Sequence, residues 1–189
     1  MDELVRQAMA KWPQVPACYN WLGLDTRGQW WLRDDATQAL GDFNTGVVGA
    51  RGSVLRHDKL VAFIQRNYAP DERGCWYFQN GPQRVYVELA LTPWVWRLNE
   101  NGRLAPFVPD FSAEALLRWE DLTVLSTWLD EDGWLYANTP MGLGLIHSQD
   151  VWLAAQQIET GHWAPEMVLK ADLGQRFGFV QSPAALHRT

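Results

Sequence analysis

The sequence has few of the features that usually identify a catalytic or metal-binding site. Its 189 residues include two cysteines, Cys18 and Cys75, which form no CxxC pair and no Cys/His cluster. A disulfide framework and a structural zinc site are therefore not expected. The GxxxxGK[ST] phosphate loop, the GxSxG turn and the HExxH helix are also missing, so we expect no cofactor and no metal.

Long apolar runs and an excess of basic charge are missing as well. The chain starts with the acidic Asp2 and Glu3, and no apolar signal-peptide segment follows. The longest uncharged run, residues 133–149, contains Pro140 and several glycines, which do not suit a membrane span. These observations predict a cytoplasmic protein without membrane contact. The net charge of −6 argues against nucleic acid as a partner.

Tryptophan, in contrast, is abundant, with twelve copies. Many of them lie near segments that read apolar residue, Asp or Asn, two polar residues and Gly. An Asp or Asn side chain caps such a turn and Gly adopts a positive φ, so each segment predicts a type I turn closing a β-hairpin. The three segments are Leu24–Gly28, Leu98–Gly102 and Leu129–Gly133. A fourth hairpin is expected over residues 75–89, turning near Asn80, Gly81 and Pro82.

Helical spacing of apolar residues predicts a smaller number of helices. They are expected at residues 2–12 before Pro13, at 57–68, at 112–119 and at 149–160 before Gly161. Asp58 and Ser148 are the expected N-caps of the second and the last. Together these elements predict an α+β fold, mainly antiparallel sheet built from β-hairpins with a few short helices.

The order hairpin, helix, aromatic strand occurs twice along the chain. This order predicts an internal repeat of two tandem ββαβ-like lobes, residues 1–105 and 106–189, with one compact unit and a chance resemblance as the alternatives. The first copy comprises residues 22–32, 57–68 and 76–82, and the second comprises 127–136, 149–160 and 177–183.

Polar and aromatic side chains are densest between Arg66 and Arg84, and Lys and Arg outnumber Asp and Glu over residues 51–84. Arginines and amides interleaved with aromatic rings suit recognition of a carboxylate, a phosphate or a peptide edge. Strand alternation places Tyr77 and Gln79 on the face opposite Trp76. An exposed hairpin with ordinary solvated groups is the alternative. The candidate binding residues are Tyr68, Arg73, Tyr77, Gln79, Asn80 and Arg84.

Three further residues have a chemical and a structural interpretation. His57 and His147 each precede an expected helix, where an imidazole serves as a base or simply ties the preceding loop. Cys75 lies close to Arg73, which favours a thiolate nucleophile, but its place on a strand favours an inert buried thiol. No catalytic residue is assigned.

Five runs resemble an uncharacterised proteobacterial family that is known only as a domain of unknown function. They are residues 5–13, residues 67–68, residues 73–87 (RGCWYFQNGPQRVYV), residues 143–148 and residues 176–183 (RFGFVQSP). The resemblance implies a bacterial, cytoplasmic protein, and it transfers no activity and no catalytic residue.

The sequence therefore favours a non-catalytic binding or protein-interaction module, whose partner is an unknown protein or a small anionic ligand. The alternative is a small enzyme, a hydrolase or transferase, that uses His57 or Cys75. A third hypothesis is single-stranded nucleic acid stacked on the aromatic residues of 66–84, which requires a positively charged groove.

Overall fold

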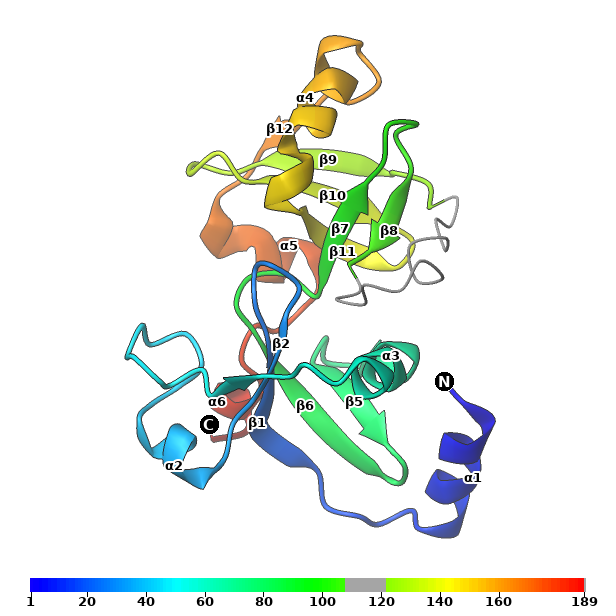
Figure 1. The fold of residues 1–189 in the computed structure, drawn as a ribbon, viewed down its shortest axis with the longest axis vertical. Helices are drawn as coiled ribbons and strands as arrows, with labels where there is room; N and C mark the ends of the chain where they lie inside the picture. Colours follow the sequence, from blue (N-terminus) through cyan, green and yellow to red (C-terminus); the bar gives the residue numbers. More distant parts are fainter. Residues whose placement is uncertain (108–121, 189) are drawn as a thin grey trace. The chain divides into compact units, whose positions relative to one another are not determined.

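The computed structural model describes residues 1–107 and 122–188 and divides the chain into two compact units (Figure 1). Each unit contains a mixed six-stranded sheet with short helices, which confirms the α+β fold. The helix expected at 112–119 lies outside the described residues. The lobes 1–105 and 106–189 stay a prediction, because compactness alone does not show which segments fold by themselves. Unit 1 comprises residues 1–25, 29–90 and 178–189, and unit 2 comprises residues 26–28 and 91–177.

Unit 1 is built around a sheet with the strand order β3-β2-β1-β6-β5-β4. The neighbouring strands are antiparallel except β1 and β6, which run parallel. Its strands are β1 (Cys18–Leu24), β2 (Trp30–Leu32), β3 (Ser53–Val54), β4 (Tyr68–Pro70), β5 (Trp76–Asn80) and β6 (Gln83–Leu89). Its helices are α1 (Glu3–Lys11), α2 (Asp35–Ala39), α3 (Asp58–Arg66) and α6 (Pro183–Arg188).

Unit 2 has a sheet with the order β12-β9-β10-β11-β7-β8, in which β11 runs parallel to β7 and β12 parallel to β9. Its strands are β7 (Trp94–Leu98), β8 (Leu104–Pro106), β9 (Ser126–Leu129), β10 (Leu135–Thr139), β11 (Gly142–Ile146) and β12 (Glu166–Met167). The helices among its described residues are the 3-10 turns η2 (Ser148–Asp150) and η3 (Lys170–Asp172), and α4 (Val151–Glu159) and α5 (Leu173–Phe177).

The predicted hairpin turns are confirmed. Gly28, Gly102 and Gly133 have φ values of 75°, 75° and 79°, and they join the antiparallel pairs β1–β2, β7–β8 and β9–β10. The fourth hairpin is β5–β6, with Gly81 at φ 57°. The β4–β5 connection uses the same pattern, since Gly74 has φ 79° and its amide donates to the Asp71 carbonyl.

Three of the predicted helices correspond to α1, α3 and α4. Two caps differ from those expected. His57 rather than Asp58 accepts the capping hydrogen bond of α3, whereas α4 follows Asp150 without a side-chain cap, and His147 caps the 3-10 turn η2 that precedes it. The aromatic strand expected from Phe177 is wrong. Phe177 ends helix α5, and Gly178 at φ 67° closes that helix, so the alternating aromatic spacing belongs to a helix end.

The two sheets share a pattern of connections. In each, the first strand of a hairpin pairs in parallel with the last strand of a three-stranded antiparallel meander. These meanders are β4-β5-β6 in unit 1 and β9-β10-β11 in unit 2. Leu22 pairs with Val87 in unit 1 and Trp96 pairs with Ile146 in unit 2, and both parallel registers lie at the same distance from the flanking turns. This correspondence relates hairpin 22–32 to residues 94–106, whereas the predicted repeat relates it to residues 127–136, and a duplication stays a prediction.

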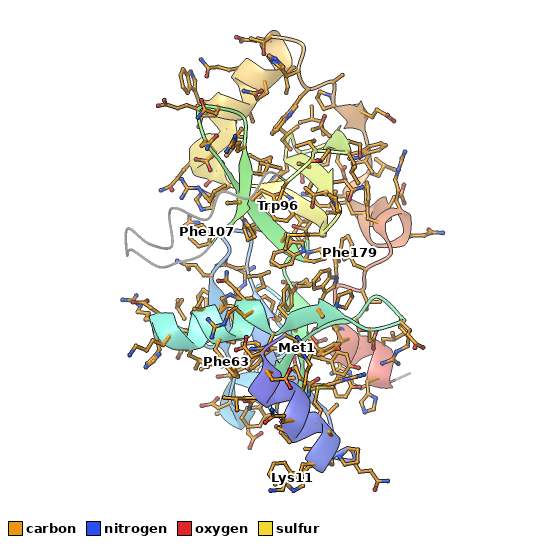
Figure 2. The ribbon with its side chains drawn as sticks, turned by 90° about the vertical axis from the view of Figure 1, so that its right-hand side faces the viewer. Met1, Lys11, Phe63, Trp96, Phe107 and Phe179 are labelled. Carbon is orange, nitrogen blue, oxygen red and sulfur yellow. The ribbon has the colours of Figure 1, made fainter. Side chains whose placement is uncertain are left out.

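Tryptophan serves mainly as core material in the described residues. Trp96 is fully buried in unit 2 (Figure 2), and its indole Nε1 donates to the Ala137 carbonyl at 2.9 Å. A Cβ atom on Gly144 would lie 2.2 Å from that nitrogen, so this glycine makes room for the ring. The buried tryptophans are Trp30, Trp76, Trp94, Trp96, Trp128 and Trp163. No helix in the described part of the chain is long and apolar enough to cross a membrane.

Candidate functional site

One face of the unit 1 sheet gathers tyrosines and arginines from four segments. We call this set, Tyr19, Asp71, Arg73, Tyr77, Arg84 and Tyr86, the tyrosine–arginine face. Tyr19 comes from β1, Asp71 and Arg73 from the β4–β5 turn, Tyr77 from β5, and Arg84 and Tyr86 from β6. Tyr77 pairs with Tyr86 across the two strands, so alternation places both on the same side of the sheet.

The tyrosine rings form a connected stack. The Tyr19 ring lies parallel to Tyr86 at a centroid distance of 4.6 Å, and Tyr77 meets Tyr86 edge-on at 5.8 Å. His187 of α6 stacks on the other side of Tyr19 at 4.1 Å. Within this stack Tyr77 and Tyr86 are buried and pack with Cys75, which fixes their rings and leaves the hydroxyl groups as the polar ends.

Asp71 is the acidic centre of the face. Its carboxylate accepts hydrogen bonds from the Arg73 amide at 2.9 Å, the Cys75 amide at 3.0 Å and the Tyr86 hydroxyl at 2.9 Å. Burial alone would raise the pKa of Asp71, but the Cys75 amide and the Tyr86 hydroxyl outweigh it and hold the pKa below its ordinary value. Asp71 is therefore a fixed anion that closes the turn and orients Tyr86.

Two exposed arginines flank this centre. The Arg84 guanidinium carbon lies 4.8 Å from the centre of the Tyr77 ring, in a cation–π arrangement, and it interacts with the Tyr86 hydroxyl. Arg73 lies 3.5 Å from the Asp71 carboxylate and interacts with the hydroxyls of Tyr19 and Tyr86. Both guanidinium groups are held by the protein while their outer edges stay in solvent.

The structure brings together three of the six predicted residues: Arg73, Tyr77 and Arg84. Tyr68 lies on the opposite face, where its ring packs against Trp30 at 5.3 Å and Trp76 at 4.7 Å, and burial raises the pKa of its hydroxyl. Asn80 ends β5 at the β5–β6 turn and is exposed.

Gln79 shares the face of Tyr77 but is buried at the β5–β6 turn. Its Nε2 donates to the Gly81 carbonyl at 2.9 Å, and Oε1 is a buried atom with no partner in the described structure. Its side chain therefore holds the turn, and the exposed part of the face is formed by the arginines.

The residues considered for catalysis have structural contacts. Burial raises the pKa of the Cys75 thiol, which keeps it protonated and a poor nucleophile at neutral pH. The Nδ1 atom of His57 accepts from the Leu60 amide at 3.2 Å, and Nδ1 of His147 accepts from the Gln149 amide at 3.2 Å. Both imidazoles therefore serve as caps. The described residues contain no group of three His, Cys, Asp or Glu side chains suited to a metal ion.

Sequence reasoning missed Tyr19, Tyr86 and Asp71. The turn signal for Asp71 was present, because Asp71-Glu72-Arg73-Gly74 has the same pattern as the three predicted turns. Tyr86 lies on a predicted strand and could have been placed by alternation with Arg84. Tyr19 could not, since it reaches the face through the parallel pairing of β1 with β6.

A protein-family model, DUF2944, with the description "Protein of unknown function (DUF2946)", matches residues 1–184. The chain belongs to the DUF2944 family. The family resemblance noted in the sequence is thereby confirmed, while a proteobacterial origin stays a prediction. No curated protein and no solved structure matches the chain.

The chemistry available to this DUF2944 chain at the tyrosine–arginine face is recognition. The face presents two fixed cations and tyrosine hydroxyls, and its carboxylate is engaged by backbone and tyrosine donors. A guanidinium group offers paired N–H donors that fit a carboxylate or a phosphate. Such an arrangement can hold and orient an anion.

Proposed function

We propose that the chain is a non-catalytic binding module whose tyrosine–arginine face takes an anionic group, a carboxylate or a phosphate, from a small ligand or a protein partner. The observation that carries the proposal is the pair Arg73 and Arg84, exposed yet held against tyrosine side chains and Asp71. Holding the guanidinium groups before binding lowers the conformational entropy that binding would otherwise cost.

The net charge of the chain favours recognition of the anion by direct contacts rather than by long-range attraction. The whole chain carries a net charge of −6, so long-range attraction of anions is weak. Recognition then depends on short-range hydrogen bonds from Arg73 and Arg84, both of which are exposed. The carboxylate or phosphate of a small aromatic anion matches this requirement, because each offers oxygen acceptors to the guanidinium N–H groups.

The proposal is tested with phenyl phosphate and benzoate as probes, titrated into the full chain by NMR or calorimetry. We expect saturable binding that weakens about tenfold or more when Arg73 and Arg84 are both replaced by Gln, because charge-assisted hydrogen bonds are worth ~1.5–3 kcal/mol each. Arg56→Gln is the matched control, since Arg56 is an exposed arginine of the same unit outside the face.

Equal binding by the double variant and the wild type would place the anion elsewhere and overturn the proposal. Absence of saturable binding for both probes would do the same. The enzyme alternative at His57 or Cys75 predicts instead that the probe is chemically changed, which the same NMR spectra would reveal. The nucleic-acid alternative predicts salt-sensitive binding of a single-stranded oligonucleotide.

A further inference from the structure

A pocket of about 420 Å³ lies in unit 1, on the face of the sheet opposite the tyrosine–arginine face. Its floor is formed by Leu22 of β1, Phe78 of β5 and Val85 of β6, which alternate with the tyrosines and arginines along the same strands. Leu60 and Ile64 of α3 form one wall. The pocket therefore has apolar side chains on the sheet side and on the helix side.

The walls are fixed by the packing of α3 on the sheet. The Phe63 ring of α3, labelled in Figure 2, meets Phe78 edge-on at a centroid distance of 5.4 Å. Ile64 is buried beside it. Because these contacts hold the helix in place, the space between Leu60 and the sheet is a preformed cavity within one unit.

A β-bulge shapes the mouth of the pocket. Asn20 has φ 68°, and the pairing of β1 with β6 shifts register between Cys18 and Leu22. Bulges of this kind redirect side chains, and Trp21 at this one keeps 44% of its surface exposed at the rim. Leu32 on the neighbouring strand β2 is 45% exposed at the same rim. A ligand that covered both would remove apolar surface from water.

The charged residues that line the pocket already have partners. Arg33 is buried, and its guanidinium donates to the Ala50 carbonyl at 2.7 Å, to the backbone and side-chain oxygens of Asn20 and to the Gly41 carbonyl. Asp34 caps helix α2 by accepting from the Thr37 amide at 2.8 Å. A positive and a negative charge, each held by the fold, leave no net charge for a ligand to neutralise.

We infer that this pocket binds a small, uncharged and mainly apolar molecule. The volume lies within the range of ~300–1,000 Å³ found for ligand pockets. The apolar floor and α3 wall supply most of the contact, and the exposed amide of Asn80 at the edge supplies a hydrogen-bonding group for a polar end. The site is independent of the proposed anion site, because it uses the other face of the sheet.

The test uses N-phenyl-1-naphthylamine, an uncharged apolar fluorophore, titrated into the full chain. We expect one saturable site whose affinity falls about tenfold or more in Leu60→Trp, since the indole fills the cavity. Leu186→Trp on α6 is the matched control, because Leu186 is exposed and does not line the pocket. Val85→Phe fills the cavity from the sheet side and replaces the first variant if that one does not fold.

The anion-site double variant at Arg73 and Arg84 should bind the fluorophore as the wild type does, which separates the two proposals. Binding that does not saturate, or equal binding by both cavity-filling variants and the wild type, would overturn the inference. A concentration-dependent dimer that excludes the fluorophore would also overturn it, because a second copy would then be the occupant.

Discussion

At the scale of single residues, Glu88 shows how a buried charge is used for anchoring. Its carboxylate lies in unit 1 at 2% exposure, where Oε1 accepts from the Ala184 amide at 3.0 Å and Oε2 accepts from the Ser182 hydroxyl at 2.5 Å. Both donors belong to the last segment of the chain. Glu88 thereby fixes the start of α6 against β6.

Burial raises the pKa of Glu88 above its ordinary value, although the two hydrogen bonds oppose the shift. A group whose pKa is higher in the folded than in the unfolded state contributes stability below its unfolded pKa, about 4.5 for Glu88, and loses this contribution as the pH rises through the folded pKa. We therefore predict a fall in the free energy of unfolding over this interval, of about 1.4 kcal/mol per unit of pKa difference.

Glu88→Gln should remove this fall, because the amide does not ionise and still accepts from Ala184. Urea unfolding at a series of pH values measures the difference in the free energy of unfolding between variant and wild type. The contributions of other carboxylates, including those with lowered pKa values, are the same in both proteins and cancel in this difference. Glu72→Gln in the exposed β4–β5 turn is the control. An unchanged pH dependence in Glu88→Gln would contradict the prediction.

Residue-level features of the site could be predicted only where local rules apply. Strand alternation places Tyr77 opposite Trp76, and the structure bears this out, because Tyr77 contacts Arg84 and Tyr86 whereas Trp76 contacts Tyr68. The same rules do not place Tyr68, because its nearness to Tyr77 in sequence does not determine its side of the sheet. Which side of a sheet a residue occupies depends on register, and Tyr68 pairs with Phe78 rather than with Tyr77.

At the scale of elements, the Asp-x-x-Gly turns are the most predictable part of the molecule. Gly needs a positive φ at the fourth position, and the Asp side chain accepts amide hydrogen bonds within the turn itself. Both requirements are local, so the sequence reveals them. Helix α5 is not predicted by the sequence, because its short aromatic end has the spacing of a strand and nothing nearby marks its start.

Two of these turns allow a matched comparison between local strain and packing. Gly74 and Gly133 both have φ 79°, but a Cβ on Gly74 would lie 2.2 Å from the Gly178 carbonyl oxygen, while a Cβ on Gly133 meets nothing within 4 Å. Gly133→Ala is expected to cost ~1–2 kcal/mol, from the left-handed backbone alone. Gly74→Ala should cost at least ~1–3 kcal/mol more, because backbone atoms must move to make room.

Urea unfolding of both variants measures this difference directly. Equal destabilisation by the two substitutions would show that the segment after Gly178 is not packed against the β4–β5 turn. That packing includes the hydrogen bond from the Val180 amide to the Gly74 carbonyl at 2.9 Å.

At the scale of the whole molecule, the chain leaves unit 1 after Ala90 and returns to it at Gly178. The return and the parallel pairings β1–β6 and β7–β11 were not predictable, because the paired segments are far apart in sequence and carry no turn signal. Local patterns therefore yield the hairpins and most helices, whereas the assembly of hairpins into sheets depends on non-local packing.

The return of the chain supports a prediction about folding. The Leu89 amide donates to the Gln181 carbonyl at 2.8 Å, so the end of β6 lies beside the final segment. A shortened chain in which a Gly/Ser linker joins Ala90 to Gly178 should fold as unit 1, because this short span closes without strain. The Asp25 turn keeps its own hydrogen bonds to the Gln29 amide and the Trp31 indole.

A fragment of residues 1–90 should be less stable than the linked chain by roughly 3–5 kcal/mol, because Glu88 loses its donors Ser182 and Ala184, and hydrogen bonds to a charged group are worth ~1.5–3 kcal/mol each. Urea unfolding followed by circular dichroism compares the two. In the fragment, Glu88→Gln should recover part of the loss, since it removes the unpaired charge, whereas in the linked chain it should change stability little near pH 4.5. If the fragment without α6 were as stable as the linked chain, residues 178–189 would be an appendage, and Glu88 would not be the residue that ties the end of the chain to its first sheet.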